Sequence, residues 1–580
     1  MNFDDLRSMP ARVEAMLDGV ADVRARPYGD YFATVEHLCH LRDIEAEGYA
    51  VRIRRLLSED DPQLADLDGG QLSRDRNYLE DDPREALRAF AAARAESVAM
   101  LERADAAAFE RAGTLENVGR VTLARIVQLM REHDAGHVRE LVVIAALDHY
   151  ARHRARYREE LEALCRIPGI SASDPGAVRV SAEATARVLV GHGIAGVRLL
   201  EVVGAHPSVY GEVLVGPSAP TILIYGHHDV QPVGRIDRWN TPPFEPLERD
   251  GRLFARGASD DKGGVMAHVA AAASYRGAPP CNLKFFIEGE EEIGSPNLGS
   301  FLERYRNLLR ADAVVLADTP NFDTGIPALT YRLRGMCQVD VEVRCLERPL
   351  HSGRGGGAVP DALAILCQMI AAIVPPSSTI VSDERFRRDA GLLDGVALLG
   401  TREQTWTVGA ITVIGIDAPP VDQSFNQIAA SARARLSIRT VPEEGGHPVR
   451  PGGRDVRPPN GEELVQRLLA FRTPHARISA RVVKSAPWWI TDASGPVFDA
   501  ARRALAHGYE HEVMMSGSGG TIGFVGAFAA AFEGTPLLLM GVEDPPCNAH
   551  SENESLHLGD WEKCIRSSIF LYDEVSHALR

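Results

Sequence analysis

The first 145 residues have apolar positions at helical spacing and few β-branched clusters. This pattern predicts four helices over residues 8–24, 31–57, 83–103 and 117–146, separated by turn-like segments such as LDGGQLSRDR. Consecutive helices with short connections are typical of a bundle. We therefore expect a four-helix bundle domain over residues 1–147.

Beyond this region, helices alternate with short apolar strands. The alternation predicts an α/β domain with a mostly parallel sheet, formed by residues 148–330 and 490–580. Residues 331–489 instead contain runs with alternating apolar and polar positions, such as QVDVEVRCL and ARARLSIRTV. They predict an α+β lid domain inserted into the α/β domain, so the whole chain is multidomain.

Polar residues follow several predicted strands, at the sheet edge where open α/β domains bind ligands. His227 and Asp229 follow the run TILI and stand two residues apart, so in an extended segment their side chains point the same way. Taken alone, YGHHDVQP is more typical of a polar turn after a strand than of a functional site. Other strands lead to acidic residues or to a late histidine: Glu288, Glu290, Glu291, Glu292, Asp318 and His550.

A further pair of carboxylates, Asp260 and Asp261, stands in RGASDDKGGV at the start of an apolar helix. Capping of a helix N-terminus explains one carboxylate, but not two. Nitrogen and oxygen donors without thiolates, gathered at one sheet edge, favour a two-metal hydrolytic site over unrelated turns. Zinc is the expected ion.

Two histidines in the bundle, His133 and His137, stand four residues apart, so a helix places them on one face. Such a pair is equally typical of a solvated helix face. His40, in the second predicted helix, offers a third metal ligand, and His37 competes with it on nearly the same face.

The composition limits the classes of binding partner that can be expected. The 580 residues are 45% hydrophobic and 25% charged, as in ordinary globular proteins. A net charge of −17 argues against nucleic acid or an anionic membrane as a partner. The segment MNFDDLRSMPARVEAML lacks the basic region and apolar core typical of a signal peptide, and no apolar run is long enough for a membrane span, so we expect a cytoplasmic location. Eight cysteines without CxxC spacing indicate reduced structural thiols.

The motifs GHHDVQP, RGASDDKGG, EGEEEIGS, LAD and NAHSENE, in that order, resemble the M20 metallopeptidase family, especially its carnosinase-like and cysteinylglycine dipeptidases. The resemblance implies one metal on His227 and Asp318, another on Glu292 and His550, and Asp260 bridging both. It further implies that Asp229 orients His227, that Glu291 is the general base, and that the Asp260–Asp261 peptide is cis. The expected ions are two zinc, manganese or cobalt ions.

The same resemblance implies a reaction. A bridging hydroxide attacks the amide carbonyl of a dipeptide or N-acyl amino acid, and Glu291 moves the proton. In the lid, the motif around His351 makes this residue a candidate oxyanion stabiliser that reaches a partner subunit, which implies a homodimer through the lid. Asn426 and Arg439 match positions near the substrate, and Arg439 offers a planar fork for a carboxylate.

One segment departs from the family pattern. SGSGGTIG keeps Gly519 and Gly520 of an Arg-Glu-Gly-Gly-Ser pattern but lacks its arginine. The departure weakens the prediction of an ordinary dipeptide and leaves a bulkier or modified amide open.

The N-terminal region resembles the DinB/YfiT superfamily of metal-binding bundles through YFATVEHLCHLRDIEAEGY and LMREHDAGHVREL. The resemblance implies one further divalent metal on His40, His133 and His137, with His40 preferred for its HLRDIE context. An alternative follows: the bundle is a thiol-dependent transferase or isomerase, and the hydrolase trims its product. A non-catalytic binding protein is a third reading, opposed by the intact set of ligands and base.

Overall fold

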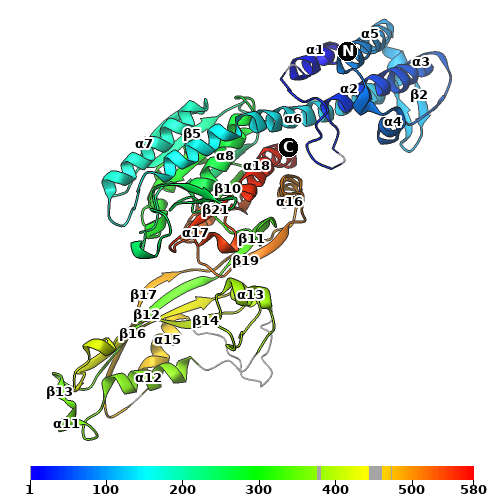
Figure 1. Ribbon diagram of the computed structural model, residues 1–580. Coiled ribbons are helices and arrows are strands. Elements are labelled where there is room, and N and C mark those ends of the chain that lie inside the picture. The colour runs from blue at the N-terminus through cyan, green and yellow to red at the C-terminus, as the bar shows by residue number, and fades with distance from the viewer. Residues whose placement is uncertain (1, 18, 30, 375–379, 443–459, 472) are drawn as a thin grey trace.

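The computed structural model describes residues 2–17, 19–29, 31–374, 380–442, 460–471 and 473–580. Three bodies follow one another in space: the N-terminal bundle, the α/β domain and the lid (Figure 1). Within these ranges, no helix combines the length and the apolar character that a membrane span requires.

The bundle contains more elements than the four predicted helices. Helix α5 (Pro83–Arg103) has the predicted bounds, whereas the predicted helix 31–57 is divided into three consecutive helical segments. A short helix and a three-stranded sheet also pack here. The elements are α1 (Asp4–Leu17), α2 (Thr34–Asp43), η1 (Ile44–Tyr49), α3 (Ala50–Ser58), β1 (Gln63–Leu64), α4 (Gly69–Arg76), β2 (Ala112–Leu115) and β3 (Gly119–Thr122).

Helix α6 (Leu123–Cys165) runs from the bundle into the α/β domain (Figure 1). Its 43 residues pass through the predicted domain boundary near 147 without a break. The sequence explains this continuity, because charged residues and alanines fill the segment and the first proline after it is Pro168. The prediction that a helix ends at 146 is therefore wrong.

The α/β domain is built on a nine-stranded sheet in the order β18-β11-β20-β10-β6-β9-β5-β4, with β19 also paired to β11. The four central strands, from β20 to β9, are parallel, whereas β5, β4 and β18 pair antiparallel. The sheet is thus parallel at its centre and between β11 and β19, and antiparallel in its other pairings. Its strands are β4 (Ala195–Leu200), β5 (Ser208–Val213), β6 (Thr221–His227), β9 (Asn282–Glu288), β10 (Ala313–Leu316), β11 (Ala328–Leu333), β18 (Trp489–Ile490), β19 (Met514–Ser518) and β20 (Leu537–Leu539).

Helices cover both faces of this sheet (Figure 1). The larger apolar core joins the sheet to α6, α8 and α18, and a second core on the other face joins it to α9 and α17. The helices are α7 (Pro175–Gly191), α8 (Lys262–Ser274), α9 (Leu298–Arg304), α16 (Pro496–Tyr509), α17 (Gly523–Ala531) and α18 (Leu558–Ala578).

The lid is an antiparallel sheet in the order β14-β16-β12-β17, with its own apolar core beneath α12 and α15. Strand β12 continues directly from β11, so the lid and the α/β domain are joined by extended chain. The lid elements are β12 (Gly335–Arg344), β13 (Leu350–His351), α11 (Ser352–Gly355), α12 (Ala362–Ile373), α14 (Gln404–Thr407), β14 (Ala410–Asp417), β15 (Gln427–Ile428), β16 (Ser431–Thr440), α15 (Gly461–Leu469) and β17 (Arg477–Ala486).

Candidate metal centres

His227 is the last residue of β6, in the middle of the parallel strands, and its side chain is fully buried. The run TILIY before it fills the core on both faces, so the first polar side chains appear where the strand ends. The His227 Nε2 atom lies 2.9 Å from Asp260 Oδ1, and Nδ1 lies 3.4 Å from Asp229 Oδ1. Asp229 therefore contacts the ring nitrogen that faces away from Asp260, as an orienting carboxylate does.

Asp260 lies between the two histidines of this centre. Its Oδ1 faces His227, and its Oδ2 lies 2.9 Å from His550 Nε2. The same His550 nitrogen lies 3.2 Å from Glu292 Oε2. The Asp260–Asp261 peptide is cis. Each oxygen of Asp260 thus lies beside one of the two histidines that are predicted to bind metal.

Glu291 and Asp318 complete the predicted set. Asp318 follows β10, and its Oδ2 lies 3.7 Å from His227 Nε2. Donor atoms of His227, Glu291 and Asp318 all lie within 4.8 Å of one another. The structure therefore brings together every residue that the sequence predicted for this centre.

The sequence reasoning missed Glu543, which follows β20. Its carboxylate lies within 4.8 Å of donor atoms of both Asp260 and Asp318. The available signal was the acidic pair Glu543 and Asp544 at the end of PLLLMGVED, because acidic residues also follow the neighbouring strands. The missed residue makes the centre more acidic than predicted.

The two other acidic residues of EGEEEIGS have different partners. Glu288 accepts a hydrogen bond from the Tyr225 hydroxyl at 2.7 Å. Glu290 accepts hydrogen bonds from the backbone N–H of His206 and from Asn297. Both are buried and occupied by these contacts, which agrees with Glu291 and Glu292 as the members of the run that face the centre.

Crowding of carboxylates dominates the electrostatics. Burial, reinforced by Asp260, raises the pKa of Asp318 to about 7. Burial and neighbouring acids likewise raise the pKa of Glu291, Glu292 and Glu543. Hydrogen bonds that His550 donates to the carboxylates of Asp260 and Glu292 raise its pKa to about 11. Two divalent cations would offset this surplus of negative charge, and the nitrogen and oxygen donors suit zinc, manganese or cobalt.

The predicted lid residues lie in two separate places. His351 and Asn426 are neighbours at β13 and β15, because the Ser352 N–H donates to the Asn426 carbonyl at 2.9 Å. Arg439 lies at the other end of β16 and donates to Thr521 Oγ1 at 2.8 Å. Ten residues of extended strand span about 30 Å. Gly519 is on the Arg439 side, where its carbonyl accepts from Arg334, and Gly520 follows it.

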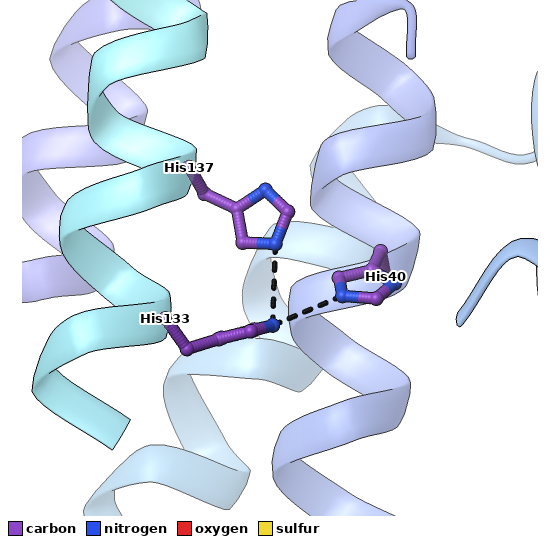
Figure 2. Close-up of side chains that lie close together, drawn as sticks. All are labelled: His40, His133 and His137. Atoms are coloured by element: carbon purple, nitrogen blue, oxygen red, sulfur yellow. Dashed lines mark hydrogen bonds between the residues drawn. The ribbon is translucent and has the colours of Figure 1, made fainter. Parts of the chain in front are cut away.

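The bundle holds a second cluster. Figure 2 shows His133 and His137 on α6 and His40 on the facing α2, with their imidazoles turned toward one another. The Nε2 atom of His133 lies 3.0 Å from that of His40 and 3.2 Å from that of His137. Ligands at about 2.0–2.1 Å from one zinc ion have similar mutual separations. The geometry therefore fits one divalent metal.

The ionisation state of these rings also suits a metal. Burial lowers the pKa of His40 to about 3 and lowers the pKa of His133 well below its usual value. Both rings are therefore neutral near pH 7 and keep a lone pair for a cation. His37 is not part of the trio. Its Nδ1 atom lies 2.9 Å from His137 Nδ1, the ring nitrogen of His137 that does not face the trio. Glu140 Oε2 lies 3.4 Å from the same His137 Nδ1.

The α/β sheet with a lid, and the acidic cluster around two histidines at the ends of its strands, define a class of metal-dependent hydrolase scaffolds. Comparison with known families gives the family. Residues 223–569 match the model of peptidase family M20/M25/M40, so this chain belongs to that family. Residues 6–141 match the model of the DinB superfamily. Both predicted resemblances are confirmed.

Similar proteins have dipeptidase names. The chain is 33% identical over 364 residues to a cysteinylglycine-S-conjugate dipeptidase of Corynebacterium striatum, covering 58% of this chain and 77% of that protein. It is 27% identical over 401 residues to the β-Ala-His dipeptidase of Mus musculus, covering 63% and 78%. The chain is thus a hydrolase with dipeptidase relatives.

Solved structures support the fold. The di-peptidase Dug1p of Saccharomyces cerevisiae superposes with a TM-score of 0.62 at 22% identity, covering 75% of this chain and 98% of that one. Human carnosine dipeptidase 1 gives the same TM-score and identity, covering 75% and 99%.

Proposed function

We propose that this protein is a two-metal dipeptidase or amidase whose site is formed by His227, Asp260, Glu292, Asp318 and His550, with Glu291 as the general base. The observation that carries the proposal is the position of Asp260, whose two oxygens face His227 and His550 at 2.9 Å each. A bridging carboxylate has this arrangement. Glu543 adds a carboxylate beside Asp260 and Asp318.

Each residue of the proposed site has a separate role in catalysis. Bound divalent cations would supply Lewis-acid activation of a water and of the amide carbonyl. Glu291 takes a proton from the attacking water and later delivers it to the leaving amine nitrogen. Because burial and adjacent acids raise the pKa of Glu291, its carboxylate is a strong enough base to hold that proton between the two steps. Asp229 fixes the ring of His227 through Nδ1.

The substrate is a small peptide or an N-acyl amino acid. Cysteinylglycine conjugates and β-alanyl-histidine are the compounds named for the relatives, so both are first candidates. Arg439 would bind the terminal carboxylate beside Gly519 and Gly520. The relatives' peptidase names favour this reading over the thiol-transferase alternative for the whole protein.

A homodimer through the lid is part of the proposal. Strand β13, which ends with His351, lies at the end of the lid farthest from the α/β domain (Figure 1). His351 therefore requires a second subunit to stabilise an oxyanion. Strand β14 is an edge strand with exposed Ile414 and Ile416, a surface that a second copy can cover.

Complementation tests this arrangement. A Glu291→Gln subunit and a His351→Ala subunit should each be inactive as homodimers. Mixed dimers should recover activity, because one site then has its own Glu291 and the partner's intact His351. Failure to recover activity in dimers shown to be mixed would contradict action across the interface.

The bundle is proposed to hold one further divalent ion on His40, His133 and His137. The support is the convergence of three imidazole nitrogens, with separations of 3.0 and 3.2 Å from the Nε2 atom of His133 to the other two. The ion's role in this chain stays separate from peptide hydrolysis in the proposal, because no carboxylate belongs to the trio.

The test of the proposed function is hydrolysis by the purified full chain. Metal-depleted protein should be inactive, and zinc, manganese or cobalt should restore cleavage of Cys-Gly, a Cys-Gly S-conjugate or β-Ala-His. An absence of amide hydrolysis across dipeptides and N-acyl amino acids, with every metal, would overturn the proposal.

A further inference from the structure

Two arginines at the junction between the lid and the α/β domain lack an acidic partner. Arg334 and Arg439 are half-buried, and no carboxylate of the described residues lies within 4.0 Å of either guanidinium. Elsewhere in the lid, arginines pair with acids, as Arg435 does with Asp340 at 2.6 Å. Two uncompensated cations in a partly dehydrated place are costly unless an anion binds there.

The two arginines are held close together by Thr521. Arg439 donates to Thr521 Oγ1 at 2.8 Å, and this hydroxyl donates to the Arg334 carbonyl at 2.6 Å. Arg334 itself donates to the carbonyls of Gly519 and Val408. Burial and the neighbouring Arg439 lower the pKa of Arg334 to about 10, as expected of adjacent like charges.

The glycines of this loop make room for the cations. A Cβ on Gly519 would lie 2.9 Å from Arg334 Nη2 and 2.6 Å from the Thr405 carbonyl oxygen. A Cβ on Gly517 would lie 2.7 Å from Arg332 Cγ and 2.3 Å from Trp406. Arg332 is also the cross-strand partner of Gly517. Any side chain at 517 or 519 would therefore displace an arginine from the loop.

The arginines lie on the side of the lid that faces the acidic centre. Lys484 pairs with Gln338 on β12, four residues beyond Arg334. A Cβ on Gly294 would lie 3.6 Å from the Lys484 ammonium nitrogen, and Gly294 directly follows the Glu291–Ile293 turn. One end of the lid sheet is thus cationic and close to the general base.

We propose that Arg334, together with Arg439, forms a two-arginine site that selects substrates with two carboxylates on the leaving amino acid, such as dipeptides that end in glutamate or aspartate. The inference rests on the proposed peptidase function and specifies its substrate class. One guanidinium takes the terminal carboxylate and the other takes the side-chain carboxylate. A neutral side chain of equal size leaves one cation without a partner.

Hydrolysis of matched substrates tests the proposal. The wild-type kcat/KM for Ala-Glu should exceed that for isosteric Ala-Gln by about 10- to 100-fold, the range of one charge-assisted hydrogen bond. Arg334→Met should reduce this ratio toward one, mainly through loss of Ala-Glu cleavage, and Arg334→Lys should restore part of it. Arg435→Met, which removes an ion-paired arginine of the same sheet, should leave the ratio unchanged. A wild-type ratio near one would overturn the inference.

Binding separates this inference from the proposed function. In the Glu291→Gln background, calorimetry of Ala-Glu and Ala-Gln should show at least a tenfold tighter Kd for Ala-Glu, and Arg334→Met should remove the difference. This result would support the anion site even if neither peptide is hydrolysed by the wild type. Equal Kd values would overturn the site even if both peptides are hydrolysed.

Discussion

The two clusters of candidate metal ligands in this chain both contain histidines but differ in their electrostatics. The bundle trio consists of three imidazoles, whereas the hydrolase centre surrounds two histidines with carboxylates. A cation on the trio would keep its full charge. In the hydrolase centre, carboxylates would largely neutralise bound cations, and the proposed mechanism leaves one acid, Glu291, to move a proton. The difference teaches that ligand convergence alone does not identify a catalyst. The catalytic reading depends on the additional acid.

The largest expected effect comes from removing the carboxylate of Glu291, which distinguishes the hydrolase centre from the bundle trio. Glu291→Gln should lower kcat by roughly 10²–10⁴-fold, the contribution of general acid–base catalysis, while the bound metal is retained. Turnover and metal content of the same preparation measure both effects. Glu290→Gln is the matched control, since Glu290 bonds to His206 and Asn297 and should keep activity within several-fold. Full turnover in Glu291→Gln would remove Glu291 from its role.

Most motifs of the hydrolase centre could be predicted from sequence because they follow short apolar strands, and parallel strands deliver their ends to one edge. His227 and Asp318 lie together for that reason, whereas Asp260 reaches them from the loop before α8. Glu543 was missed because its strand was used only to place His550. The length of α6 was underestimated because no proline or glycine marks the boundary between the domains.

The lid shows the other limit of sequence reasoning. His351 and Arg439 both match substrate positions of the family, but separation along β16 places them about 30 Å apart in one subunit. Pairing of strands, rather than local pattern, decides this distance. The unpaired arginines at the junction were equally invisible, because a missing ion pair is a property of the folded chain.

Removal of a bundle ligand should affect one region alone. His133→Ala takes away the central nitrogen of the trio, so the chain should lose about one equivalent of metal while dipeptide hydrolysis stays within about twofold. Metal analysis beside kcat/KM measures the separation. The control His153→Ala changes a histidine of the same helix outside the trio. A large loss of hydrolysis in His133→Ala would show that the sites are coupled.

Without metal, the stability of the bundle and the stability of the hydrolase centre should change in opposite directions with pH. His40, with a pKa of about 3, binds fewer protons folded than unfolded, so the bundle loses stability as the pH falls below about 6.5. Asp318, with a pKa of about 7, binds more protons folded than unfolded, so the hydrolase centre loses stability as the pH rises from about 4 to 7. Hydrogen exchange of each region, corrected for intrinsic rates, between pH 4.5 and 7 measures both slopes. Parallel slopes would contradict this account.

The smallest expected effect concerns the contact between the regions. Arg139, two residues beyond His137, pairs with Asp573 on α18 at 3.0 Å. Arg139→Ala should lower the free energy of unfolding by about 1 kcal/mol, as for a partly exposed ion pair. Urea denaturation measures the loss. Metal content and hydrolysis should stay unchanged, and a lost metal equivalent would show that this contact supports the trio.

The metal content of the full chain tests the central claim, two separate centres in one protein, most directly. Elemental analysis of purified protein saturated with zinc and then freed of excess should give about three equivalents per chain. His133→Ala should give about two, and Asp260→Asn should lose only equivalents of the hydrolase centre. Two equivalents that His133→Ala leaves untouched would remove the bundle site, and a chain without bound metal would contradict the whole account.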